Sequence, residues 1–359
     1  MRTNLFFTAL FFHLTIFSQQ YEHIKGIVLD NETNKGIPSV HVSVNNGELV
    51  TITNSDGEFI IKSDNPIKRL LFSHLGYNPR SIDSQEISKS VNIKLEPRSQ
   101  QLKEVVVVGS TARKIVEQAI DNIKNNHFIE PVNYAFFTRI IHYTKDSSLH
   151  FINEHVGHIS QNKIHNSKFG LLKSRMNYFS AVGEELLKKY RLISLTEMYT
   201  DNLGKYQEDY IHHRRNKAYS YTFKDDINIM GRECYQIAFT TDEKTYYKSG
   251  ILVIDKKDYG IHKKILTYGD YKEINFNRHA GHYYLSSTHY IKKRSSYIEE
   301  RYTIYNKGPQ KDNLEYVSKM SLTPKFTRKY SKEFDDEFWK EFNFIPLPGW
   351  IKTQIETTP

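Results

Sequence analysis

The hydrophobic and polar residues in the first part of the chain alternate in short runs that are separated by turn residues. One such run is Ile24–Asp30, and the pair Asp56-Gly57 stands between two alternating stretches, which is typical of a hairpin turn. Alternation places every second side chain on one face of a strand. Six or seven short strands within about 75 residues predict a small β-sandwich, to which we assign residues 20–97.

The pattern becomes helical after this region. Ser110 can cap a helix, and the apolar residues that follow recur on one helical face as far as Ile123. We therefore expect a helix that ends near Asn126, before Pro131.

From Tyr134 onward the chain alternates again, first as a hairpin and later as a long antiparallel meander. Between these lies a polar stretch at 162–212, in which we expect a short helix at Glu184–Tyr190. Long antiparallel strands with helices beside them predict an α+β domain with a large, half-barrel-like sheet over residues 110–330. The chain as a whole is therefore expected to be mainly β.

The two ends of the chain carry their own signals. A cation followed by the 13-residue apolar run Leu5–Phe17 is typical of a signal peptide at residues 1–18, cleaved after Ser18. No other run is long enough for a transmembrane span in the mature chain. At the other end, residues 331–359 are expected to form a helix around Trp339 and a tail.

Composition and charge narrow the function classes. The net charge of +9 is spread along the chain, which fits attraction to anionic envelope surfaces and offers no basic nucleic-acid motif. Aromatic residues make up 13% of the chain and favour strands. The single cysteine, Cys234, has no partner for an internal disulfide, and its alternating surroundings indicate a small core residue.

An ordered series of motifs in the N-terminal region resembles the carboxypeptidase regulatory-like domain of Bacteroidetes cell-envelope proteins. The motifs are Gly26-x-Val28-x-Asp30, Gly36-Ile37-Pro38-x-Val40-x-Val42, Thr53-x-x-Asp56-Gly57-x-Phe59 and Ser73-x-x-Gly76-Tyr77. The resemblance covers about residues 22–97. It implies a transthyretin-like sandwich that acts as an accessory module and has no catalytic residues of its own.

Four consecutive valines, Val105–Val108, lie in the connection at 98–109. The connection resembles the energy-transducer box that follows the same sandwich in outer-membrane receptors. The roughly 22-strand barrel of those receptors does not fit into the 250 residues after Gly109 (359 minus 109). The valines are therefore either a docking segment retained from that architecture or a strand that is covered on both faces, and we favour the strand.

A second, short resemblance lies in the meander. Gly250–Asp255, followed by Tyr259-Gly260-Ile261, is similar to a hairpin of the periplasmic lipoprotein-carrier half-barrels. In that family the sheet cups an acyl chain, which implies an apolar ligand site in the second domain.

A zinc peptidase site is the sharpest catalytic hypothesis that the sequence offers. One His-x-x-Glu pair occurs, at His127 and Glu130, and His262 could supply the third ligand. The pair stands at a helix exit before a proline, and the chain has no parallel α/β domain to hold it. We therefore assign no catalytic, metal-binding or cofactor-binding residue.

Three other polar groups receive structural interpretations. They are Asp30, Glu32 and Asn34; Glu154, His155 and His158; and His212–Arg215. The first departs from a calcium loop because Gly36 comes one position too late. On a strand, His155 and His158 would face opposite sides and could not share a metal. The third is interpreted as a solvated basic turn.

These observations favour a non-catalytic binding or scaffolding protein, exported to the periplasm or the outer-membrane surface. Its partner would be an envelope protein, a glycan or a lipid, and its second domain would bind an amphipathic lipid or a peptide. Four tyrosines could line that site or fill an ordinary core: Tyr283, Tyr284, Tyr290 and Tyr297. The alternatives are a carboxypeptidase-like hydrolase and an accessory part of an outer-membrane receptor system.

The substitution Val106→Asp separates the two interpretations of the valines. If they form a buried strand, the unpaired charge should cost several kcal/mol and lower the melting temperature. If they are an exposed docking segment, the melting temperature should stay unchanged and a partner interaction should be lost. A thermal melt of this variant beside the wild type decides between them.

Overall fold

The structure is a computed structural model. It describes residues 22–98, 109–127, 132–161, 167–183, 192–194, 209–212, 216–243, 248–267, 270–307, 316–317, 321–322 and 344–357. The signal peptide, the valines, the helix expected at Glu184–Tyr190 and the helix expected around Trp339 lie outside these residues.

Seven strands form the N-terminal sandwich: β1 (Glu22–Asp30), β2 (His41–Val44), β3 (Leu49–Ile52), β4 (Glu58–Ser63), β5 (Arg69–His74), β6 (Tyr77–Asp83) and β7 (Ser90–Leu95). They make a three-stranded sheet, β4-β1-β7, and a four-stranded sheet, β3-β2-β5-β6. The core between the sheets includes Val28, Val42 and Phe72, each fully buried. The predicted β-sandwich is thereby confirmed.

The turn at Asp56-Gly57 is present, but it does not close a hairpin, so that expectation was wrong. β3 and β4 belong to different sheets, and the turn carries the chain from one to the other. The side chain of Asn54 accepts hydrogen bonds from the backbone N–H groups of Asp56 (2.9 Å) and Glu58 (2.8 Å). Gly57 has a φ of +80°, which favours glycine. Local residues thus determine the turn, whereas strand partners are chosen by the packing of the whole sandwich.

The second part contains α1 (Gly109–Asn126) and one large antiparallel sheet. Its strands are β8 (Val132–Tyr143), β9 (Leu149–Gln161), β10 (Ser167–Tyr178), β12 (Ser220–Ile229), β13 (Arg232–Thr240), β14 (Ser249–Asp255), β15 (Ile261–Leu266), β16 (Tyr271–His279), β17 (His282–Lys293), β18 (Ile298–Lys307) and β19 (Tyr316–Val317). The order is β12-β13-β14-β15-β16-β17-β18-β8-β9-β10-β19. Beside it lie two short 3₁₀ helices, η1 (Asp209–Ile211) and η2 (Asn216–Ala218), and the pair β11 (Leu192–Ser194) and β20 (Ser321–Leu322).

The strand β10 is not predicted by the hydrophobic pattern. The stretch 162–212 is polar in sequence, yet β10 runs through it and pairs with β9 over most of its length. The polar sequence hides this strand because the charged residues Lys173 and Arg175 of β10 are largely buried. Arg175 forms an ion pair with Glu154, so its charge is compatible with a buried strand.

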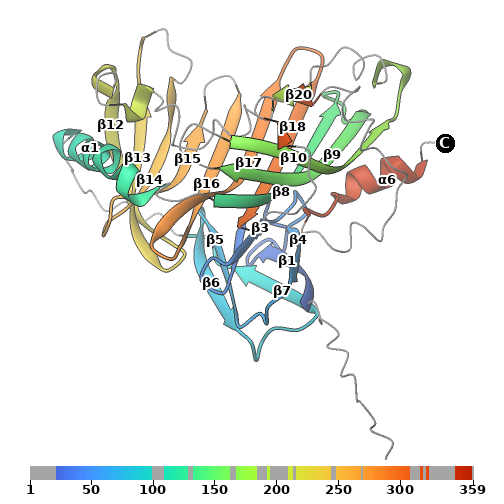
Figure 1. Cartoon of the computed structure of the whole chain (residues 1–359), viewed down its shortest axis with the longest axis horizontal. Helices are drawn as coiled ribbons and strands as arrows, with labels where there is room; N and C mark the ends of the chain where they lie inside the picture. The colour runs from blue at the N-terminus through green and yellow to red at the C-terminus, as the bar shows by residue number, and fades with distance from the viewer. Residues whose placement is uncertain are drawn as a thin grey trace, which may run out of the picture.

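The two faces of the large sheet have different neighbours. We call inner face the one that packs against α1, whose apolar stripe covers the β12–β14 end (Figure 1). The outer face carries the alternate residues, such as Phe137, Ile141 and Tyr302, and packs against the sandwich. In Figure 1 the sandwich lies below the sheet, and α1 and α6 (Gly349–Thr357) lie at opposite ends.

The sandwich docks through the outer surface of its four-stranded sheet. Ile52, 1% exposed, joins the apolar cluster of the outer face and not the sandwich core. His41 Nε2 lies 3.2 Å from Ser286 Oγ, and the Val50 N–H donates to Asn306 Oδ1 over 2.9 Å. The interface is therefore apolar at its centre, with hydrogen bonds beside it.

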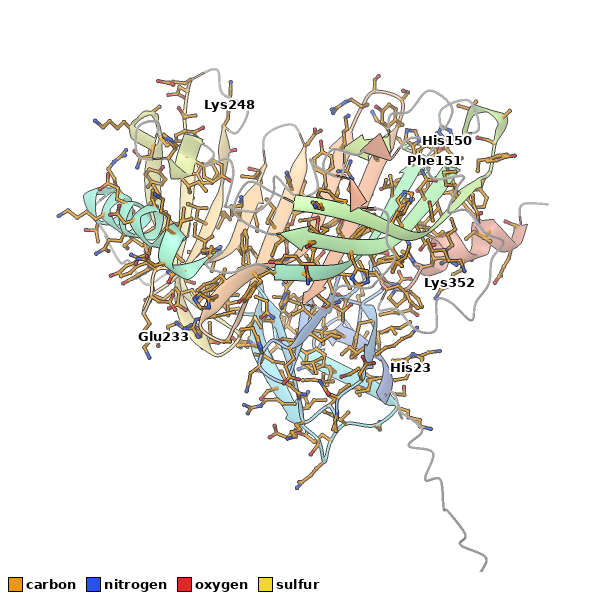
Figure 2. The ribbon with its side chains drawn as sticks, in the orientation of Figure 1. His23, His150, Phe151, Glu233, Lys248 and Lys352 are labelled. Carbon is orange, nitrogen blue, oxygen red and sulfur yellow. The ribbon has the colours of Figure 1, made fainter. Side chains whose placement is uncertain are left out.

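The C-terminal segment 344–357 fastens the two domains together. The carbonyl oxygen of Pro346 accepts hydrogen bonds from Arg139 Nη1 (3.1 Å) and Asn54 Nδ2 (3.3 Å), which belong to different domains. Asp56 caps α6 by accepting from the Gly349 N–H at 2.6 Å. Lys352, labelled in Figure 2, reaches from α6 to the sandwich. In the described part of the chain, no helix combines the length and the apolar character that crossing a bilayer requires.

The position of Ile52 allows the independence of the sandwich to be tested. In the full chain, Ile52→Asp should destabilise the fold by several kcal/mol, because it places an unpaired charge in the interface. In a fragment of residues 20–97 the same side chain lies on an open face, so the cost should be below about 1 kcal/mol. Thermal melts of both forms measure the difference.

Phe72→Ala is the matched control. Phe72 lies in the sandwich core, so its loss should cost about 3–5 kcal/mol in the fragment and in the full chain alike. A wild-type fragment without a cooperative melt would contradict the proposed boundary near Pro97.

Candidate functional site

A row of five polar residues crosses the inner face of the large sheet. Register places them directly opposite one another on five neighbouring strands, in the order Thr288, Thr303, Thr138, His155 and Ser174. None is more than 3% exposed. Each occupies one inward position of its own strand, so residues far apart in the sequence become one line of hydroxyl and imidazole groups. We call this line the polar row.

Hydrogen bonds join the members of the polar row in pairs. Thr138 Oγ1 lies 2.9 Å from Thr303 Oγ1, and His155 Nδ1 lies 2.7 Å from Ser174 Oγ. Burial lowers the pKa of His155 from 6.5 to about 4, although the charge of Glu154 opposes the shift. The imidazole is therefore neutral at pH 7, and its Nε2 has no hydrogen-bond partner.

Asn153 lies next to the polar row on β9, two positions before His155 and on the same face. Its side chain is 0% exposed, and neither the oxygen nor the nitrogen of its amide has a hydrogen-bond partner. A buried polar group without a partner costs about 1–3 kcal/mol, and such groups are rare in native proteins. Three unpaired polar atoms, two on Asn153 and one on His155, thus lie side by side on the inner face.

Apolar residues flank this group. Ile140 and Met176 stand opposite Asn153 on the two neighbouring strands. Phe151, labelled in Figure 2, precedes Asn153 on the same face of β9 and is fully buried. On the other side of the row lies Phe136, also fully buried. The surroundings are apolar, while the row itself can donate and accept hydrogen bonds.

The predicted set of Glu154, His155 and His158 does not come together. His155 faces inward, whereas Glu154 and His158 lie at alternate positions of β9 and face outward, as the strand periodicity predicts. Glu154 is buried between Arg139 and Arg175, and Arg139 Nε donates to its Oε1 over 2.8 Å. Burial alone would raise the pKa of Glu154, but the two guanidinium groups outweigh it and lower the pKa. The three buried charges of Arg139, Glu154 and Arg175 on the outer face are therefore paired with one another.

The structure brings His127 and His262 to the same tyrosine. The His127 ring stacks on Tyr283 with ring centroids 5.1 Å apart, and the Tyr283 hydroxyl lies 3.3 Å from His262 Nε2. Glu130, the remaining member of the proposed zinc set, lies outside the described residues. Burial lowers the pKa of His127 to about 3, so this ring is neutral.

Cys234, Asp255 and His262 place one ligand atom each within 4.8 Å of one another. A metal ion there would meet a cation, because Arg232 bonds to both oxygens of the Asp255 carboxylate. His262 Nε2 also lies 3.1 Å from Asp255 Oδ2. Burial raises the pKa of Cys234 and disfavours the thiolate that metals bind. The geometry favours an ion-pair network here, and Cys234 is a buried residue of β13.

The other predicted polar groups have structural partners. Asp30 accepts hydrogen bonds from the N–H groups of Glu32 (2.9 Å) and Thr33 (2.7 Å), and also from the Tyr77 hydroxyl at 2.7 Å. Its carboxylate therefore orders a turn. Of the basic turn His212–Arg215, only His212 belongs to the described residues.

The four tyrosines do not form a single wall. Tyr283 is fully buried and donates to Asp258 Oδ1 over 2.9 Å, while Tyr290 donates to Asp270 Oδ2 over 2.8 Å. Tyr297 stacks on His142 with centroids 4.4 Å apart, and Tyr284 is partly buried. The hypothesis of a shared tyrosine-lined site is therefore not supported by their positions.

The sequence gives little indication of the polar row. Each member is a single polar residue within an alternating strand, and only the pairing register shows that the five residues are neighbours. The one sequence feature that could indicate the row is the presence of polar residues at inward positions of several strands.

Residues 24–107 match the family model of the CarboxypepD_reg-like domain. This confirms the resemblance that the ordered motifs of the N-terminal region indicate. No curated protein matches the chain.

Solved structures that are similar to this chain include a LolA superfamily protein from Nitrosomonas europaea (11% identity, 56% of this chain and 95% of that chain covered, TM-score 0.27). They also include a putative outer membrane lipoprotein-sorting protein domain from Vibrio parahaemolyticus (11%, 61% and 97%, TM-score 0.27). A third is a DUF1329 family protein from Desulfovibrio piger (12%, 56% and 95%, TM-score 0.25). Similarities of this size carry no argument about function.

The buried imidazole of His155 predicts a pH dependence of stability. The unfolded chain binds this proton near pH 6.5, whereas the folded chain binds it only near pH 4, where burial has placed the pKa. Between these values the unfolded state holds more protons, so the free energy of unfolding falls as the pH decreases. The contribution is at most about 1.4 kcal/mol per pH unit.

In His155→Gln this contribution disappears, so the free energy of unfolding should fall less steeply between pH 6.5 and pH 4 than it does in the wild type. Denaturant unfolding at several pH values measures the slope. His282→Gln, a partly exposed residue of β17, is the control and should change the slope much less. Equal slopes for wild type and His155→Gln would refute the assignment.

Proposed function

We propose that this protein is a non-catalytic binding protein of the cell envelope, exported by its N-terminal apolar run. Its second domain holds an amphipathic ligand, a lipid or an extended peptide, against the polar row on the inner face of the large sheet. The N-terminal sandwich acts as an accessory module that supports this sheet from the outer face.

The observation that carries the proposal is the amide of Asn153. Both of its polar atoms are buried and unpaired, and the unpaired His155 Nε2 belongs to the neighbouring position on the same face. Unpaired buried groups lower stability, and they persist most readily where a ligand completes them. Another buried amide of the same sheet is paired through its nitrogen: Asn275 Nδ2 donates to Glu273 Oε1 (3.1 Å) and to Ser287 Oγ (3.0 Å).

The chemistry of the ligand follows from these atoms and their surroundings. An amide can donate and accept at once, which suits a peptide group or a lipid head with both kinds of atom. The neutral imidazole adds one more ring nitrogen for pairing. Ile140, Phe151 and Met176 provide the apolar contacts that the rest of such a ligand requires. Because the row is shielded from water, each hydrogen bond formed there would be strong.

Asn153→Leu tests the proposal with opposite effects on stability and binding. Leucine has the branching of asparagine without its polar atoms, so the variant should be more stable by about 1–2 kcal/mol. It should also lose the ligand. Native mass spectrometry and organic extraction of protein purified from its own envelope report binding, and a denaturant melt reports stability.

Asn275→Leu is the matched control. The amide nitrogen of this buried residue donates two hydrogen bonds on the outer face, so its loss should destabilise the fold while leaving any bound ligand in place. Asn153→Ala removes the amide without added volume and covers the case in which leucine does not fit. Bare wild-type protein after gentle extraction, or equal ligand content in wild type and Asn153→Ala, would reject the proposal.

A further inference from the structure

A second candidate site lies between the two domains, on the face of the large sheet opposite to the polar row. A cavity of about 170 Å³ opens where the sandwich meets the β13–β16 part of the outer face. It is lined by Ser43, Asn46, Arg69, Leu71, Met230, Arg232, His262 and Arg278. This space is large enough for several water molecules.

Two buried polar atoms on the cavity wall have no partner. Ser43, 2% exposed, has an unpaired hydroxyl and belongs to the sandwich. His262, also 2% exposed, has an unpaired Nδ1 and belongs to the second domain. Each domain thus contributes to the cavity wall one residue whose buried polar atom is unsatisfied.

Three guanidinium groups line the cavity, and none of the lining residues is acidic. Each arginine pairs with a carboxylate that is not among the lining residues: Arg232 with Asp255 and Asp258, Arg278 with Asp258, and Arg69 with Asp83. The Arg69–Asp83 pair is largely exposed, so its guanidinium can exchange partners at little cost. The cavity therefore presents cationic fork donors, which match the oxygens of phosphate and carboxylate groups.

The position of the proton on the His262 ring determines that a ligand must offer this ring a hydrogen-bond donor. Burial lowers the pKa of His262, so the ring is neutral, while the pKa of Asp255 is held low by its bonds to His262 and Arg232 despite burial. The ionised Asp255 accepts at 3.1 Å from His262 Nε2, which must therefore carry the proton. Nδ1 is then an unpaired lone-pair acceptor on a residue that lines the cavity.

We propose that this inter-domain cavity binds a phosphate group that retains a proton, either hydrogen phosphate or a phosphomonoester. The unprotonated oxygens accept from the arginines and from the Ser43 hydroxyl, and the P–OH donates to His262 Nδ1. Sulfate has the same shape and lacks the proton, and a phosphodiester lacks it as well. The bound group would contact both domains and hold them together. This site is separate from the polar row and does not depend on the proposed ligand there.

Isothermal titration calorimetry of the full chain tests the proposal with four probes. Inorganic phosphate and glycerol 3-phosphate represent the free ion and a monoester, while sulfate and glycerophosphocholine lack the proton. We expect phosphate, the monoester or both to bind at least tenfold more tightly than sulfate and the diester. Binding of inorganic phosphate alone would identify the free ion, and binding of the monoester would identify a substituted phosphate.

Variants link the binding to the cavity. Arg69→Gln and Ser43→Ala should each weaken phosphate binding about fivefold or more, without a loss of melting temperature, because neither side chain has a buried partner in the free protein. Arg80→Gln on the neighbouring strand β6 is the charge-matched control and should bind as the wild type does. Asn153→Leu should also bind phosphate normally, which keeps the two proposals distinguishable.

Two outcomes would overturn the inference. One is the absence of saturable phosphate or monoester binding at millimolar concentrations. The other is equal affinity for sulfate and phosphate with equal effects of Arg69→Gln and Arg80→Gln, which would indicate general attraction to a basic surface.

Discussion

The structure depends on covering the outer surface of the four-stranded sheet. On β2 and β3 both faces are apolar or buried: Val42 points into the sandwich, and Ile52 points at the large sheet. A sheet with two buried faces needs a second layer on each side. The large sheet supplies that layer, and once it is in place the inter-domain cavity and the course of the C-terminal segment are largely determined.

Several charged residues that are buried on the outer face of the large sheet form ion pairs. Glu154 lies between two arginines, and Lys263 donates to Glu273 over 2.7 Å. Such pairs roughly balance the cost of burying charge, and removing one partner would cost about 3–5 kcal/mol. These pairs join neighbouring strands of the large sheet: β8, β9 and β10 in the first case, and β15 and β16 in the second.

Unpaired buried polar groups occur on both faces: Asn153 and His155 on the inner face, and His262 on the outer face. The unpaired amide of Asn153 costs about 1–3 kcal/mol of stability. An apolar residue at this position would avoid the cost in stability. The presence of asparagine therefore indicates selection for a property other than stability. The same reasoning applies to Ser43 and His262 at the inter-domain cavity, where one unpaired atom comes from each domain.

The sequence by itself determined the local structure and the family of the first domain. Alternation predicted the sandwich strands, the apolar stripe predicted the helix that ends at Asn126, and the ordered motifs indicated the domain that the family model matches. These features depend on neighbouring residues, which a pattern records directly. Strand pairing does not depend on neighbouring residues. Asp56-Gly57 indicates a turn but not which strands pair on either side of it. Arg175 has the polarity of a loop residue, and only its ion pair with Glu154 explains its place in a buried strand. The polar row and the inter-domain cavity were decided only by the tertiary structure, because register and domain docking bring together residues that are up to 235 positions apart, from Ser43 to Arg278.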